Sequence, residues 1–149
     1  MKLFPMIGRL AIFFSVVLVS CNKQDPEPSL GDQIAGEYTG TYYTVGGTTR
    51  VNLPATNSAG VTATVKISLT KVNDASANVK VTFSATDKTG KVVDAFNNYD
   101  GLTLKKATTG EIEGYLGSTK HVSWVNGEVG VTVPDPTPTK TVVFYGKKN

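Results

Sequence analysis

A strict alternation of apolar and polar residues through the middle of the chain constrains its fold more than any other feature. From Val61 to Leu69 every second residue is apolar, and threonine, lysine and serine fill the positions between them. The stretch from Val79 to Ala85 repeats this pattern. Because successive side chains of a β-strand point to opposite faces, both stretches predict strands with one apolar and one polar face. A sheet of such strands must bury its apolar face.

Turn signals separate further strands of the same kind. Gly46-Gly47 and Asn126-Gly127 are suited to two-residue hairpin turns, and Asp87 to Gly90 is suited to a bulged turn. Residues 97–101 form a polar loop in this interpretation, and residues 134–139 carry three prolines, which a central strand excludes. The predicted strands are 37–45, 48–53, 61–72, 79–85, 91–96, 102–106, 111–116, 120–125, 128–133 and 140–146.

Short strands joined by tight turns describe an all-β antiparallel meander. A meander leaves two unpaired edges, which promote aggregation unless they are covered or joined. The economical solution pairs residues 37–45 with residues 140–146. The sequence therefore predicts a single up-and-down β-barrel of about 8–10 strands, wide enough to be filled by side chains or to hold one small ligand. A β-sandwich of the same strands is the alternative.

The N-terminal residues have the composition of an export signal. Lys2 and Arg9 precede an uncharged run from Leu10 to Val19, which is about half the length that a membrane-spanning helix needs. The run ends in Leu18-Val19-Ser20-Cys21, and Cys21 is the only cysteine, so no intramolecular disulfide is available. These residues resemble the signal peptide and lipobox of a bacterial lipoprotein. An ordinary signal peptide with an incidental cysteine is the alternative.

This resemblance implies a division of the chain and a location. Residues 1–20 would be a cleaved signal peptide, Cys21 would carry the lipid, palmitate included, and residues 21–33 would be a flexible tether before a domain at 34–149. The anchor makes the membrane a partner. Asn22 after the cysteine favours the outer membrane of the cell envelope, whereas Lys23 beside Asp25 leaves the leaflet open.

Charge excludes one class of partner. The chain has 15 basic and 12 acidic residues. Removal of Lys2 and Arg9 with the leader leaves 13 basic residues, a net charge of +1. A charge so small and scattered does not steer a protein toward nucleic acid.

Two stretches carry a resemblance to a barrel family. Residues 36–42, Gly-Glu-Tyr-Thr-Gly-Thr-Tyr, resemble the opening strand of calycin barrels, with Tyr38 at the position of the lipocalin tryptophan. Residues 142–148 are similar to the closing strand of calycin-like lipoprotein domains. The resemblance implies a lipocalin-like barrel. The C-terminal helix and the cysteine pair of true lipocalins are absent from this sequence, so the resemblance implies the barrel itself but not a vertebrate-style ligand cup.

No constellation of residues predicts catalysis, so the chain is expected not to be an enzyme. Glu111 and Glu113 share a strand face, as a glycosidase pair would, but Lys105 and Lys106 on the preceding strand indicate cross-strand ion pairs instead. His121 is the only histidine and lacks triad partners, which favours a surface or structural role. One histidine and one cysteine cannot hold zinc or haem, and residues 97–100 lack a calcium-loop signature, so no cofactor or metal is expected.

The aromatic residues divide between the two faces of the predicted barrel. Tyr43, Tyr115 and Tyr145 are assigned outward, where they could bind a protein or a glycan. An inward set could line a pocket for a small apolar or amphipathic molecule, or simply fill the core. The favoured function is a tethered binding barrel, and the alternative is a filled barrel that presents loops and tyrosines to a partner. The inward set is Tyr38, Tyr42, Phe83, Trp124 and Phe144.

Overall fold

The computed structural model describes residues 26–135 and 137–149, so the predictions for Cys21 and the export signal lie outside the described residues. Its first element is a short helix, α1, at Leu30–Ile34, and a 3-10 turn, η1, lies at Pro138–Lys140. The strands are β1 Gly36–Val45, β2 Thr49–Asn52, β3 Ala55–Thr56, β4 Thr62–Asn73, β5 Ser76–Thr86, β6 Val92–Lys106, β7 Ile112–Leu116, β8 Thr119–Val125, β9 Glu128–Val133 and β10 Val142–Lys148.

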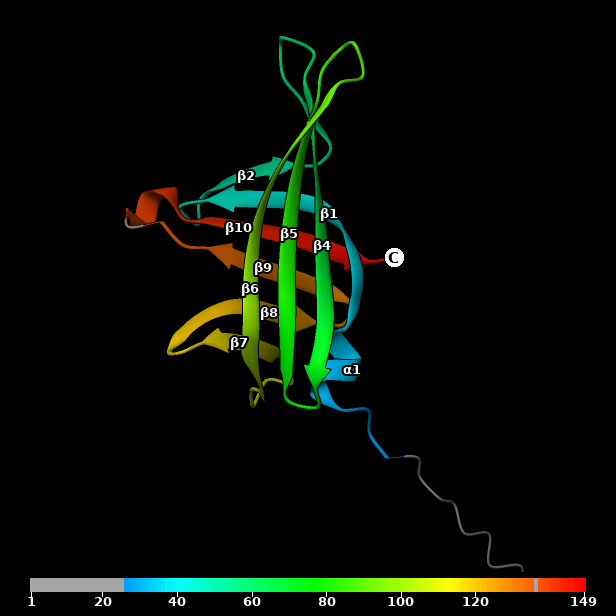
Figure 1. Cartoon of the computed structure of the whole chain (residues 1–149). Coiled ribbons are helices and arrows are strands. Elements are labelled where there is room, and N and C mark those ends of the chain that lie inside the picture. The colour runs from blue at the N-terminus through cyan, green and yellow to red at the C-terminus, as the bar shows by residue number, and fades with distance from the viewer. Residues whose placement is uncertain (1–25, 136) are drawn as a thin grey trace, which may run out of the picture.

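The sheet closes on itself as a barrel, which excludes the sandwich. Consecutive strands from β4 to β10 pair antiparallel, and β1 pairs with β10 on one side and with β4 on the other. Eight strands, β1 and β4 to β10, therefore form a closed up-and-down barrel, with the first strand beside the last as predicted. In Figure 1, β4, β5 and β6 form a long wall that crosses in front of the other barrel strands.

Closure of the barrel is uneven along its axis. Residues Gly36 to Thr39 of β1 pair with β4, but from Tyr42 onward the same edge of β1 pairs with β2 instead. The upper part of β4, at Thr62 and Ala63, pairs with β3. The connection between β2 and β3 therefore bridges a region where β1 and β4 have separated.

The lower part of the barrel is filled with side chains. The core combines aliphatic residues from β4, β5, β6, β7, β8 and β9 with Tyr38 of β1. Ile34 and Tyr38 have no exposed surface, and the Tyr38 hydroxyl donates a hydrogen bond to the Ile34 carbonyl at 2.5 Å. The helix α1 thus closes the lower end of the barrel in Figure 1, and Tyr38 connects the helix to the core.

Residues 30–33, assigned to the flexible tether from their sequence, belong to the folded domain. The Ser29 hydroxyl caps α1 by accepting a hydrogen bond from the Asp32 amide, and Asp32 forms an ion pair of 2.8 Å with Lys71 of β4. Glu27 also forms an ion pair, of 2.7 Å, with Lys106 of β6. The sequence prediction failed here because a five-residue helix carries too little periodicity to be recognised.

The predicted polar loop at residues 97–101 is also wrong. These residues lie inside β6, which pairs with β5 from Val92 to Thr103. The register of this pairing shifts between Ala77 and Val79, opposite Leu102 and Tyr99, and Gly101 there has a φ of 69°. A bulge of this kind accommodates turn-forming residues inside a continuous strand. Composition alone predicts a loop for such residues, which is why the prediction failed.

Candidate functional site

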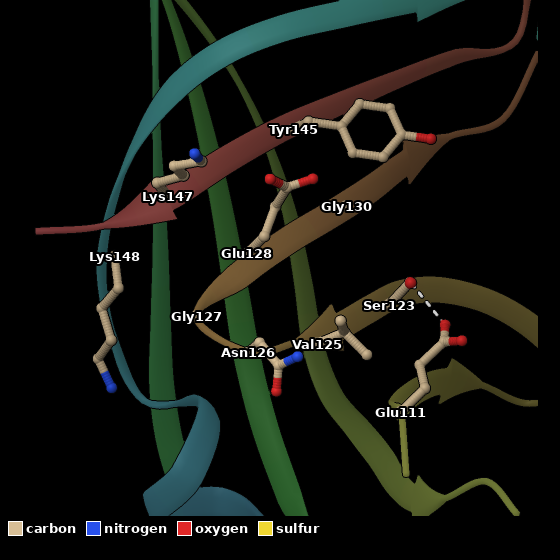
Figure 2. Close-up of a pocket in the computed structure, with 10 residues that line it drawn as sticks. All are labelled: Glu111, Ser123, Val125, Asn126, Gly127, Glu128, Gly130, Tyr145, Lys147 and Lys148. Atoms are coloured by element: carbon tan, nitrogen blue, oxygen red, sulfur yellow. Dashed lines mark hydrogen bonds between the residues drawn. The ribbon is translucent and has the colours of Figure 1, made fainter. Parts of the chain in front are cut away.

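Two concave regions lie on opposite faces of the barrel wall. One, the cup, opens where β1 and β4 separate at the upper end of the barrel in Figure 1. The other, the outer groove, runs over the outside of β8, β9 and β10 and is shown in Figure 2.

The cup has a volume of about 430 Å³, within the range of pockets that bind small molecules. Ala63 of β4 faces Ala85 of β5, and Val65 faces Phe83, so these side chains share the inner face of the sheet. Tyr43 and Val51 are a register pair on the opposite wall. The wall is mostly apolar, with polar atoms at its rim. The cup is lined by Tyr43, Val51, Ala55, Thr56, Asn57, Val61, Ala63, Phe83 and Ala85.

The five aromatic residues predicted to face inward do not form one site. Phe83 lines the cup, and Phe144 is half-buried with its ring centroid 5.8 Å from that of Tyr43. Tyr38 is sealed in the lower core, and Trp124 packs against the core with its indole nitrogen buried and without a hydrogen bond among the described residues. Burial raises the pKa of Tyr38, and the nearby Trp124 offsets part of that rise.

The predicted orientations of Tyr42 and Tyr43 are wrong: Tyr42 points to the outer face of the barrel and Tyr43 to the inner face. The register between β1 and β10 shifts between Gly40 and Tyr42, so one extra residue enters β1 and all later side chains change face. Tyr42 then pairs with the outward Tyr145, while Tyr43 pairs with Phe144 and lines the cup. Simple alternation from Tyr38 could not reveal this shift, which depends on the neighbouring strand.

The outer groove has a volume of about 720 Å³. In Figure 2 it extends from the turn at Asn126 and Gly127 to Tyr145, with Glu111 and Ser123 along one side and Lys147 on the other. Gly130 of β9 lies between Tyr145 and Ser123 in register. The groove is lined by Glu111, Ser123, Val125, Asn126, Gly127, Glu128, Gly130, Tyr145, Lys147 and Lys148.

Glu111 and Glu113, the carboxylates weighed for catalysis, are held in an ion-pair network with Lys120. The Lys120 ammonium lies 2.9 Å from Glu113 and 3.6 Å from Glu111. The Tyr115 hydroxyl donates to Glu113, and the Ser123 hydroxyl donates to Glu111. Cross-strand ion pairs to these glutamates exist, but not with the predicted partners. The cation is Lys120 of β8, whereas Lys105 lies over the Tyr115 ring and Lys106 forms an ion pair with Glu27.

We expect this network to make stability sensitive to acid. The hydrogen bond and charge of Lys120 lower the pKa of Glu113 below its ordinary value. A carboxylate with a lowered pKa stabilises the fold above its unfolded pKa, and this contribution is lost as pH falls through the folded pKa. Urea denaturation between pH 6 and pH 3 should therefore show a shallower acid loss for Glu113→Gln than for the wild type. Equal slopes would contradict the expectation.

His121 and the possible metal-binding residues are the remaining polar candidates for a functional site. His121 is only 5% exposed, its ring lies 4.3 Å from that of Tyr99 between centroids, and its Nδ1 atom is 3.2 Å from the Thr132 carbonyl oxygen. Of the surface or structural role predicted for His121, this burial excludes the surface position. Among the described residues no group of three or more His, Cys, Asp or Glu side chains could hold a metal ion. None of the helices in that part of the chain has the length and apolarity that a membrane crossing requires.

Comparison with known proteins adds little. No protein-family model and no curated protein match the sequence. Among solved structures, a de novo designed fluorescence-activating β-barrel matches with 8% sequence identity and a TM-score of 0.35, over 80% of this chain and 96% of the designed chain. A similarity this low supports no statement about the ligand of this chain.

Proposed function

We propose that this protein is a lipocalin-like lipoprotein, anchored to the bacterial cell envelope through Cys21, that holds a small apolar or amphipathic molecule in the cup. The observation that carries the proposal is the cup itself, an apolar cavity of about 430 Å³ at the open end of a barrel that is otherwise filled. No bond is made or broken in this role, so the protein is not an enzyme in this proposal.

The composition of the cup supports an apolar ligand with a polar end. Alanine and valine side chains leave room between the two walls, and Phe83 and Tyr43 supply large apolar surfaces. Thr56 and Asn57 lie at the exposed rim, where they can bind the polar end of a ligand. Because the lower core is closed by Tyr38 and α1, the ligand enters and leaves through the rim.

The proposal that the cup binds the ligand is tested by a substitution on β4 that fills the cavity. Ala63→Phe adds a ring to the cup from β4, whereas Thr64→Phe adds the same ring to the exposed outer face of that strand. With residues 26–149 and the neutral fluorophore N-phenyl-1-naphthylamine as probe, we expect Ala63→Phe to weaken binding at least tenfold and Thr64→Phe to leave it unchanged. A wild-type domain without probe fluorescence enhancement, or an equal effect of both variants, would contradict the cup as the site.

The anchor is tested separately. Two or three acyl chains make attachment to a bilayer effectively permanent, so the wild type should sediment with the membrane fraction and Cys21→Ala should appear in the soluble fraction. If both fractionate alike, lipidation is wrong. Mass spectrometry of the protein purified from its native membrane would report both the acyl chains on Cys21 and any small molecule that copurifies with the cup.

A further inference from the structure

We propose that this protein forms a two-fold symmetric dimer in which residues 92–98 of β6, the free edge, pair with the same residues of a second copy. The inference does not depend on the ligand proposed for the cup. It rests on three features of the described residues: a strand edge without a neighbour, side chains exposed on both faces of that strand, and two charges that meet only between copies.

The free edge pairs on one side only. Residues 92–103 pair with β5, whereas β7 reaches β6 only from Thr103 to Lys106, and in Figure 1 the upper part of β6 extends above β7 and β8. At the turn before β6 the Asp87 amide donates to the Lys91 carbonyl. Because hydrogen-bonded and non-hydrogen-bonded pairs alternate in an antiparallel ladder, every second residue after this turn directs its N–H and C=O groups away from β5. These residues are Val92, Asp94, Phe96 and Asn98.

Every residue of the free edge is exposed, whichever face of the sheet its side chain occupies. Val93 lies beside Ala85 on the inner face and is 61% exposed, and Phe96 on the outer face is 60% exposed. The stretch contains no proline, and its inner-face residues are uncharged. It therefore lacks two of the devices that keep free edges from pairing, and its backbone is suited to another extended strand.

Two charges on the outer face identify that strand as the same strand of a second copy. Asp94 of β6 and Lys80 of β5 form no ion pair among the residues that the structure describes. Within one chain Asp94 lies beside Ser84, four residues from Lys80 along β5 and so about 13 Å away. The Lys80 ammonium instead lies 5.0 Å from the centroid of the Phe96 ring.

A two-fold axis through Ala95 joins these charges. The axis makes the two strands antiparallel, so residue 92 lies beside residue 98 of the second copy and residue 94 beside residue 96, which pairs all the free N–H and C=O groups. Asp94 then lies beside Phe96 of the second copy, over which the Lys80 ammonium of that copy is held. Symmetry forms this contact twice, whereas an axis through Asp94 would bring two carboxylates together.

The antiparallel arrangement also orients the dimer. The two α1 helices lie at its opposite ends, because α1 closes the end of the barrel that is remote from the free edge. Anchors on both copies would therefore hold the barrels with their long axes along the bilayer.

Disulfide cross-linking tests the position of the axis. The experiment uses the full chain with Cys21→Ala, because Cys21 is the only native cysteine. The two Ala95 residues form a non-hydrogen-bonded pair with Cα atoms about 4.5 Å apart, a separation that a disulfide spans. Ala95→Cys should therefore give a linked dimer on mild oxidation, seen by non-reducing electrophoresis. Val93→Cys is the matched control, because its two copies lie about 13 Å apart and should not link.

Charge reversal tests the partner of the free edge. Without an introduced cysteine, the same chain should sediment as a dimer at micromolar concentration. Asp94→Lys and Lys80→Glu should each weaken dimerisation at least tenfold, because each places like charges together twice, and the double variant should restore it. Lys147→Glu makes the same change at an exposed lysine of β10 and should have no effect. Circular dichroism shows whether each variant retains the barrel.

Three results would overturn the proposal. The first is a chain that sediments as a monomer at every concentration, and the second is equal cross-linking through residues 93 and 95. The third is a double variant that dimerises as weakly as the single ones, which would show that Asp94 and Lys80 do not meet between copies.

Discussion

Replacement of Tyr38 by alanine is expected to cost about 3–5 kcal/mol of the free energy of unfolding, as truncation of a buried aromatic side chain usually does. Tyr38 has no exposed surface and packs in the core, on β1 between β4 and β10. Because small domains are stable by only about 5–15 kcal/mol, this variant should lose a large part of its stability. Urea denaturation followed by circular dichroism measures the effect.

The Tyr38→Phe variant separates the hydroxyl from the ring. The hydroxyl donates to the Ile34 carbonyl, a hydrogen bond that adds to the packing of Ile34 and Leu30 of α1 on the core. Removing the donor leaves a buried carbonyl without its partner, and we expect a loss of about 1–2 kcal/mol. A loss for Tyr38→Ala of less than about 1 kcal/mol would mean that the lower end of the barrel is not organised around this side chain.

Substitution of Gly40 by valine is expected to disrupt the closure of the barrel at the junction of β1 and β4. A Cβ atom at Gly40 would lie 2.7 Å from Cβ of Val65 and 2.8 Å from the Val65 carbonyl oxygen. A backbone atom cannot move aside as the end of a flexible side chain can, so β1 must shift away from β4. We expect a loss of about 3 kcal/mol or more, at the upper end of what overpacking costs.

The control for Gly40→Val is Thr64→Val, which introduces the same side chain beside Val65 but on the exposed face of β4. Its effect should stay within about 0.5 kcal/mol of the wild type, as exposed substitutions usually do. Equal stabilities of the two variants in urea would show that β1 tolerates a side chain at its junction with β4. The position of β1 would then not depend on Gly40.

The fold was predictable because its signals are local. Alternation at 61–72 and 79–85 marked β4 and β5, and Asn126-Gly127 marked the hairpin between β8 and β9. The pairing of β1 with β10 followed from the need to remove free edges. The continuous β6 did not follow, because residues 97–101 have turn composition and only the pairing with β5 makes them a strand.

The candidate sites were less predictable than the fold. Phe83 was placed correctly on the inner face, but Tyr43, assigned outward, lines the cup instead of Tyr42. The outer groove brings together Glu111, Ser123 and Tyr145, which become neighbours only through the pairing of β8, β9 and β10. The pattern within one strand does not predict which residues of the neighbouring strands lie beside it.

The sequence by itself determined most of the strands, the apolar faces of β4 and β5 and the barrel, because side-chain alternation and turn propensity act between residues close along the chain. Only the tertiary structure decided where the barrel stays open, which tyrosine faces inward and where the outer surface is hollow. These features depend on the register between strands far apart in the sequence. A single extra residue in β1, between Gly40 and Tyr42, reverses the faces of all the side chains that follow it in that strand.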